Sequence, residues 1–245
     1  MFNWFRNRRR RRLVAQPFPA QWLTILRDNV RAYNFLSADQ QAKLQRSLRI
    51  MAAERTWEGC GGLKLTDEIK VTIAGQACLL LLGVAEGYYF DGLPSILVYP
   101  AAYATPTDLQ SGFVVDEDQE TYGESWHRGP IVLSWQQALE GGRDPRDGRN
   151  LVLHEFAHHL DGLDGATEGS PPLSSREQER RWATVTQREF ARLDEQARQG
   201  EETLLDHYGA SNPAEFFAVC TECFFERPVE MRKQHRELYN IVGEL

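Results

Sequence analysis

Residues 151–160 read Leu-Val-Leu-His-Glu-Phe-Ala-His-His-Leu, and this stretch constrains the fold more than any other part of the chain. Apolar residues stand before, between and after the polar ones, which predicts a helix that is buried over most of its surface. Residues four apart on a helix lie about 40° apart around its axis. The imidazoles of His154 and His158 can therefore reach one metal ion.

Residues suited to capping stand at both ends of this predicted helix. Asp144-Pro145 or Asp147 offers an N-cap upstream. Gly162 and Gly165 follow the last apolar residue and are suited to end a helix. The two histidines are therefore expected to lie within one continuous helix.

Glu155 stands between the two histidines, and this H-E-x-x-H spacing is typical of zinc peptidases. Its carboxylate would point beside the metal, where it can accept a proton from the attacking water. The alternative is a surface helix with two solvated histidines. Three apolar residues directly before His154 argue against that alternative. We therefore interpret His154 and His158 as zinc ligands and Glu155 as a general base.

A zinc ion that catalyses a reaction usually has three protein ligands and one open position. Asp164, His207 and Glu215 are the candidates for the third ligand. Asp164 stands ten residues after His154, where some zinc peptidases carry a ligand. However, the glycine that such extended motifs place three residues earlier is displaced here, because Asp161 holds that position. This displacement weakens the case for Asp164.

Glu215 lies in the stretch Asn-Pro-Ala-Glu-Phe-Phe-Ala at 212–218, which predicts a turn followed by an apolar helix. A carboxylate in the first turn of such a helix is costly to bury without a partner. A metal ion or a salt bridge would supply that partner, and the salt bridge is the commoner case. Seven residues earlier, Tyr208 carries a phenol that can donate a hydrogen bond to an oxyanion.

The motif at 154–158, Tyr208 and the stretch at 212–218 together resemble the Mlc titration factor family of bacterial zinc peptidases. The catalytic domain of anthrax lethal factor is similar over the same pieces. The resemblance runs through most of residues 20–230 and includes the stretches 65–69, 98–100 and 129–135.

This resemblance implies one zinc ion per chain, held by His154, His158 and Glu215. It also implies aminopeptidase-like hydrolysis of peptides, with Glu155 as general base and Tyr208 as oxyanion donor. A cytoplasmic regulatory role follows in the same way: binding of the glucose repressor Mlc, which relieves repression of sugar-uptake genes. The alternative is a repressor-titrating protein without catalysis, in which the zinc is structural. Glu155 and Tyr208 favour the peptidase, because a structural site needs neither.

Several other residues near the motifs bear on the predicted site. Asp161 lies on nearly the same helical face as the two histidines, so it either orients a ligand imidazole or is solvated. His159 points away from that face and is expected to be structural. Glu222 could support the zinc site. Cys220 and Cys223 have C-x-x-C spacing, but they fall in an apolar helix and are interpreted as core residues.

The expected fold is an α+β zincin-like metallopeptidase, with a small mixed sheet, an active-site helix and a mainly helical surround. Apolar spacing predicts helices over 20–34 and 37–53, and a further helix is expected over 176–200. Residues 129–135 predict a short edge strand that could bind substrate as an added strand, an ordinary sheet strand being the alternative. The Gly/Ser/Pro-rich residues 162–175 are expected to be a surface connection, or else a lid.

The charge of the chain is uneven. Six of the 28 Lys and Arg residues lie within residues 1–12, which leaves 22 against 35 acidic residues, a net charge of −13 over the rest. We expect residues 1–15 to form a basic, flexible tail and residues 16–245 a single domain, either compact or in two lobes around a cleft. The tail could touch anionic lipid or nucleic acid, but a solvated tail is favoured.

Composition excludes several classes of protein. The acidic body argues against nucleic acid as the principal partner. No apolar run approaches the ~20 residues that span a bilayer. The start of the chain lacks the apolar stretch of a signal peptide. Four cysteines are too few for a disulfide framework, which indicates a reducing compartment such as the cytoplasm.

Overall fold

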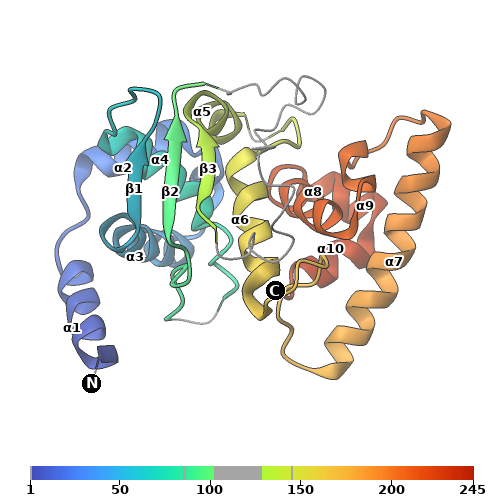
Figure 1. Ribbon diagram of the computed structural model, residues 1–245, viewed down its shortest axis with the longest axis horizontal. Coiled ribbons are helices and arrows are strands. Elements are labelled where there is room, and N and C mark those ends of the chain that lie inside the picture. Colours follow the sequence, from blue (N-terminus) through green and yellow to red (C-terminus); the bar gives the residue numbers. More distant parts are fainter. Residues whose placement is uncertain (1, 85–86, 102–128, 145) are drawn as a thin grey trace.

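The computed structural model describes residues 2–84, 87–101, 129–144 and 146–245, and these residues form a mainly helical protein with one small sheet (Figure 1). Helix α6 (Leu151–Asp161) lies between the sheet on one side and the C-terminal helices on the other. The predicted α+β class is confirmed. The other α-helices of the described residues are α1 (Phe2–Ala15), α2 (Ala20–Asn29), α3 (Ala38–Glu54), α4 (Asp67–Ala77), α5 (Trp135–Arg143), α7 (Arg176–Gln199), α8 (Pro213–Glu226), α9 (Pro228–Gln234) and α10 (Arg236–Val242).

The helices expected from apolar spacing are present. Those expected over 37–53 and 176–200 are α3 and α7, with ends that differ by at most one residue. The helix expected over 20–34 is divided, because Val30 leaves the helical region (φ −125°, ψ 78°) and is buried in the core. A short 3-10 helix, η1 (Arg31–Phe35), follows it.

The sheet has three strands in the order β1-β2-β3, namely β1 (Thr56–Gly59), β2 (Ser95–Tyr99) and β3 (Ile131–Ser134). Trp57 is paired with Ile96, and Ile96 with Ile131, and both ladders are parallel. The sequence had suggested a mixed sheet, whereas the strands of the described residues are all parallel. Parallel neighbours need a crossover connection, and α4 lies in the connection between β1 and β2.

Two hydrophobic clusters meet at α6. The first joins α2, α3, α4, the sheet and α5, and it receives Val152, Leu153 and Phe156 from α6. The second joins α7, α8, α9 and α10, and it receives Ala157. Apolar residues on both sides therefore bury the helix, as the sequence predicted, and they fix the direction of its polar face. No helix of the described residues is both long and apolar enough to cross a bilayer.

The basic segment at the N-terminus was expected to be a flexible tail, and the structure differs. Residues 2–15 form α1, which packs beside α3 (Figure 1). Its anchor is Arg10, whose Nε and Nη2 donate hydrogen bonds of 2.9 and 2.6 Å to Glu54. Arg10 also donates to Asp91 and, over 3.1 Å, to the carbonyl of Gly87. An arginine buried between two carboxylates holds the helix against the body.

Arg10→Gln is expected to lower the free energy of unfolding by about 3 kcal/mol, because it leaves the partly buried carboxylates of Glu54 and Asp91 without their closest cation. Urea unfolding at neutral pH measures this loss. Arg8→Gln is the matched control, since Arg8 is exposed on the same helix and its loss should cost less than about 0.5 kcal/mol. Equal stability of the two variants would contradict the anchoring role of Arg10.

Candidate metal centre

Helix α6 carries the H-E-x-x-H motif and begins at a side-chain cap. The side chain of Asn150 accepts a hydrogen bond of 3.0 Å from the N–H of Leu153. The N-cap predicted at Asp144 or Asp147 is therefore wrong, because the Asp147 carboxylate instead accepts from the N–H of Arg149 within the preceding loop. The helix ends at Asp161 with Gly162 as its C-cap, as predicted.

Helix α8 brings a third side chain to the motif. Asn212 caps this helix by accepting from the N–H of Glu215, and Pro213 occupies the first helical turn. Glu215 Oε2 lies 3.0 Å from His154 Nε2 and 3.3 Å from His158 Nε2. The two Nε2 atoms are 3.1 Å apart. Two adjacent helices thus aim three potential ligand atoms at one point.

The spacing and chemistry of these atoms fit a metal ion. Ligands at about 2.0–2.2 Å in tetrahedral geometry stand about 3.3–3.6 Å from one another, and the observed separations are 3.0 to 3.3 Å. Two imidazoles and one carboxylate are a donor set that divalent zinc takes in catalytic sites. Within the described residues, His154, His158 and Glu215 are the one group of three or more His, Cys, Asp or Glu residues with this arrangement.

Glu222, two turns after Glu215 on α8, orients His154. Its Oε1 lies 2.8 Å from His154 Nδ1, and its Oε2 accepts a hydrogen bond from the N–H of Asn150. In the neutral imidazole this contact places the proton on Nδ1, so the lone pair of Nε2 faces Glu215 and His158. Both partners are buried. Glu222 therefore lies where the sequence suggested that it could support the site.

The carboxylates of Glu215 and Glu222 beside His154 favour the protonated form of its imidazole. Burial lowers the pKa of His154, but hydrogen bonds to Glu215 and Glu222 outweigh it and raise the pKa to about 10. Burial raises the pKa of Glu215, but its contacts with His154 and His158 outweigh it and lower the pKa to about 2. A metal ion must displace this proton, so metal binding should weaken as the pH falls.

Glu155 is partly buried and belongs to α6, outside the three-atom cluster. Burial raises the pKa of its carboxyl group, and the nearby imidazoles of His154 and His158 only partly oppose that rise. A carboxylate with a raised pKa is a stronger base, which suits a group that accepts a proton near neutral pH.

Tyr208 lies beside the cluster on a short 3-10 helix, η6 (His207–Ala210). Its ring centroid is 6.1 Å from that of His154. Asp206 begins η6 by accepting a 3.0 Å hydrogen bond from the N–H of Tyr208, and Arg149 donates a 2.6 Å bond to Asp206. The loop before α6 is thus tied to the segment that carries the tyrosine.

The other candidates for a third ligand lie elsewhere. Asp164 follows α6 in a 3-10 turn, η5 (Gly162–Asp164), and accepts a 3.1 Å hydrogen bond from the N–H of Ala166. His207 is exposed. The structure places neither residue in the three-atom cluster.

Asp161 has a role that sequence reasoning missed. It is completely buried and accepts hydrogen bonds of 2.9 and 2.6 Å from the N–H groups of Gly169 and Ser170. It therefore neither orients an imidazole through these contacts nor lies in solvent. Gly169 packs so closely on α8 that a Cβ there would lie 2.1 Å from the carbonyl oxygen of Pro213. Asp161 thus ties the loop 162–175 to the start of the helix that carries Glu215.

Two further expectations concern structural residues. His159 is buried, and its ring centroid lies 5.9 Å from that of Phe90. Burial together with the charge of Arg55 lowers the pKa of His159 to about 4, which keeps the imidazole neutral at physiological pH.

Cys220 and Cys223 are buried free thiols in α8, and burial raises the pKa of Cys223 to about 12. The interpretation of both cysteines as core residues agrees with this burial.

A cavity of about 700 Å³ opens beside the cluster and is partly lined by Tyr208 and Glu222. Acidic residues outnumber basic ones in its lining: Glu140, Asp147 and Asp206 line it together with one arginine, Arg149, which is itself paired with Asp206. The three candidate ligands do not line it, so the cavity lies next to the metal position and not around it.

A helix with H-E-x-x-H and a carboxylate from a following helix define a metallopeptidase site. Residues 4–245 match the family model of the glucose-regulated metallo-peptidase M90, and the chain belongs to this family. The family implies a bound metal, and the donor set described above fits one.

Relatives extend over nearly the same length. An uncharacterized protein of Synechocystis sp., slr2042, is 38% identical over 237 residues, which cover 96% of this chain and 86% of the relative. Mlc titration factor A of Yersinia pestis is 33% identical over 220 residues, which cover 85% of this chain and 77% of the relative. The protein of the same name from Yersinia pseudotuberculosis has the same identity and coverage. The predicted membership of the Mlc titration factor family is confirmed.

Proposed function

We propose that this protein is a zinc-dependent peptidase in which His154, His158 and Glu215 hold one zinc ion. The observation that carries the proposal is the convergence of three ligand atoms, 3.0 to 3.3 Å apart, from two helices that are packed together. Glu155 stands one residue after the first ligand, on the same helix. A structural zinc site would need no such carboxylate.

Glu155, Tyr208 and Glu222 each have a separate role in the proposed reaction. Zinc, when bound, would polarise the peptide carbonyl and make a water molecule more acidic. Glu155 accepts the proton of the attacking water and passes it to the departing amine. Tyr208 donates a hydrogen bond to the oxyanion of the tetrahedral intermediate. Glu222 holds the ring of His154 in the orientation that keeps Nε2 directed at the metal position.

We infer an aminopeptidase-like preference from the resemblance and from the charge of the neighbouring cavity. Glu140, Asp147 and Asp206 give that cavity an excess of acidic groups, which favours a substrate with a free, protonated amino terminus. Strand β3 supports this mode of binding, because it is an edge of the sheet that the described residues form and it packs against α6. A peptide could be added there as a further strand.

The substrate preference can be tested with one peptide in two forms. The zinc-loaded enzyme should cleave the peptide with a free amino terminus at least about tenfold faster than its N-acetylated form, since a salt bridge to the ammonium group is lost on acetylation. Equal rates on both forms would contradict the aminopeptidase preference and leave the peptidase assignment intact. Hydrolysis of neither form would contradict the assignment itself.

A second candidate function is the binding of a transcriptional repressor in the cytoplasm. It is supported by the name of the Yersinia relatives, Mlc titration factor A, at 33% identity. In this reading the chain would sequester the repressor Mlc, and the metal site would be structural. Co-purification of a purified Mlc repressor with this protein tests the partner directly, and absence of binding at micromolar concentrations would contradict it.

Glu222→Gln is expected to weaken zinc binding about 10- to 100-fold, because it removes the charged partner that orients His154. Competition with a chelator of known affinity measures the effect. Glu226→Gln is the matched control, since Glu226 is a buried glutamate one turn later on α8, outside the ligand cluster. Unchanged zinc affinity in Glu222→Gln would contradict the orienting role.

A further inference from the structure

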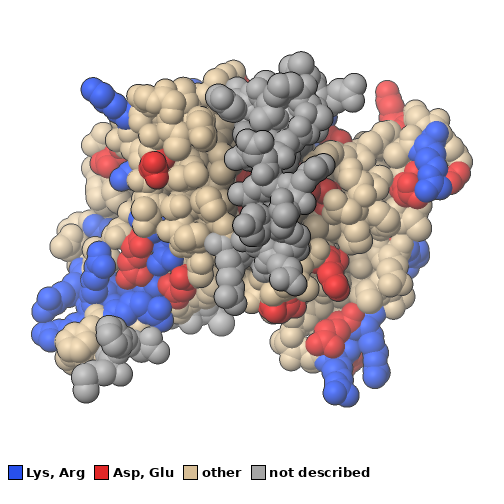
Figure 2. Space-filling view, viewed as in Figure 1, with Lys and Arg blue, Asp and Glu red and all other residues tan. Residues whose placement is uncertain are grey.

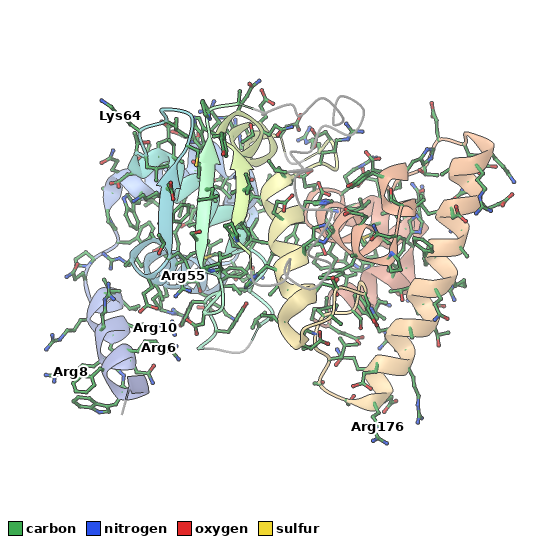
Figure 3. The ribbon with its side chains drawn as sticks, in the orientation of Figure 1. Arg6, Arg8, Arg10, Arg55, Lys64 and Arg176 are labelled. Carbon is green, nitrogen blue, oxygen red and sulfur yellow. The ribbon has the colours of Figure 1, made fainter. Side chains whose placement is uncertain are left out.

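The arginines of helix α1 form two groups, one facing the body of the protein and one facing away from it. Arg6, Arg9 and Arg10 face the body of the protein. Arg6 lies 3.9 Å from Asp91, Arg9 donates to the carbonyl of Ala53 over 3.3 Å, and Arg10 is buried in its ion pairs. These three residues dock the helix. In Figure 3, Arg10 lies between α1 and the body, near Arg55.

The opposite side of α1 carries three arginines and two aromatic residues. At 100° per residue, positions 4, 5, 8, 11 and 12 fall within an arc of about 120° that faces away from the docking arginines. Trp4 and Phe5 are each 60% exposed, and their rings meet edge to face at 5.0 Å. Arg8 lies 5.5 Å over the Trp4 ring and points away from the body in Figure 3.

None of the three outer arginines has an acidic partner in the part of the chain that the structure describes. Arg8, Arg11 and Arg12 are all exposed, and the ion pairs that α1 makes with described residues involve Arg6 and Arg10. Basic side chains gather over α1 at the lower left of Figure 2. An anionic surface would complement this face without displacing any internal contact.

The chemistry of the outer face favours a membrane over a nucleic acid. Exposed tryptophan is enriched at the bilayer interface, where its ring lies at the level of the headgroups. The rest of the chain carries a net charge of −13, which would repel a polyanion that extended beyond α1. Because α1 lies at the edge of the molecule (Figure 1), a membrane can contact this helix without extending over the acidic body.

We propose that the outer face of α1 binds membranes that contain anionic phospholipids. Trp4 and Phe5 enter the boundary between headgroups and acyl chains, while Arg8, Arg11 and Arg12 contact the phosphate groups. Each arginine near such a surface strengthens binding about fivefold, so the three together strengthen it about 100-fold. Binding of this kind is peripheral and reversible, and it extends beyond the peptidase function.

Sedimentation of the full chain with lipid vesicles tests the proposal. The protein should bind vesicles of mixed phosphatidylglycerol and phosphatidylcholine at least about tenfold more strongly than vesicles of phosphatidylcholine alone. Binding should fall steeply at about 1 M sodium chloride, where the Debye length is about 3 Å. Equal binding to both kinds of vesicle would overturn the electrostatic part of the proposal.

Two variants and one control localise the surface. The triple variant Arg8→Gln, Arg11→Gln and Arg12→Gln should bind anionic vesicles about 100-fold more weakly. The variant Trp4→Ser and Phe5→Ser should also bind more weakly, but with the same dependence on salt. The control Arg176→Gln, Arg180→Gln and Arg232→Gln removes the same charge from exposed positions of α7 and α9 and should bind within about twofold of the parent.

The outcomes that would overturn the proposal are specific. Equal loss in the control and the α1 triple variant would show that net charge alone drives binding. A DNA duplex that binds at concentrations at which anionic vesicles do not would assign the face to nucleic acid instead. Thermal unfolding verifies that each variant is as stable as the parent, and Arg10, which anchors α1, is retained in all of them.

Discussion

Glu155→Gln is expected to lower the rate of peptide hydrolysis about 10³-fold while the protein keeps its zinc. General bases contribute roughly 10² to 10⁴ in rate, and glutamine has the size of glutamate but cannot accept the proton of the attacking water. Glu155 lies outside the cluster of ligand atoms, so the metal position is left intact. Hydrolysis of a free peptide and zinc content by atomic absorption are the two measurements.

Glu168→Gln is the matched control, because Glu168 is exposed in the loop after α6 and the same atoms are exchanged. Its activity should equal that of the parent. If Glu155→Gln cleaves as fast as the parent, the mechanism proposed here is wrong. If it loses hydrolysis but still sequesters a repressor, binding and catalysis are separate functions of the same chain.

Glu215→Ala is expected to lose zinc. Structural zinc sites with four ligands bind with roughly 10–16 kcal/mol, so removal of one ligand should weaken binding by about 10² to 10³-fold. Zinc content after dialysis measures the loss. Zinc should also raise the melting temperature of the parent and leave that of the variant nearly unchanged, because only a bound ligand stabilises the folded state.

Asp164→Ala is the control for this assignment, because Asp164 was the competing candidate in the sequence and lies in a turn. It should retain zinc at the level of the parent. Loss of zinc in Asp164→Ala alone would overturn the choice of Glu215. Loss in both would mean that the loop after α6 also shapes the site.

The motif helix could be predicted from the sequence because its signals are local. The apolar spacing of 151–160 and the glycine at 162 lie within one element and need no knowledge of the fold. Asn150 shows the limit of this reasoning, because an asparagine directly before the apolar run is a better cap signal than the more distant Asp144 and Asp147. Glu222 could also have been identified more firmly, because it stands seven residues after Glu215, on the same face of an apolar helix.

Contacts between segments that lie far apart in the chain could not be predicted from the sequence. Arg10 pairs with Glu54 and Asp91, which are 44 and 81 residues away in the chain. Because the sequence does not show that these partners lie nearby, the arginine run was expected to be a solvated tail. Asp161 accepts hydrogen bonds from backbone N–H groups of a loop. Every residue except proline has such a group, so the sequence does not indicate which ones Asp161 binds. The parallel pairing of the sheet likewise depends on crossovers and not on the composition of its short strands.

The four side chains that join α6 to α8 also limit how the molecule can move. His154 contacts Glu215 on one side and Glu222 on the other, two turns apart along α8, and His158 contacts Glu215 as well. A sliding or rotation of one helix against the other would break all of these contacts together. The two helices should therefore behave as one rigid body on every timescale shorter than unfolding. Any opening that admits a peptide must take place in the segments around this pair, so hydrogen exchange should be slowest in α6 and α8.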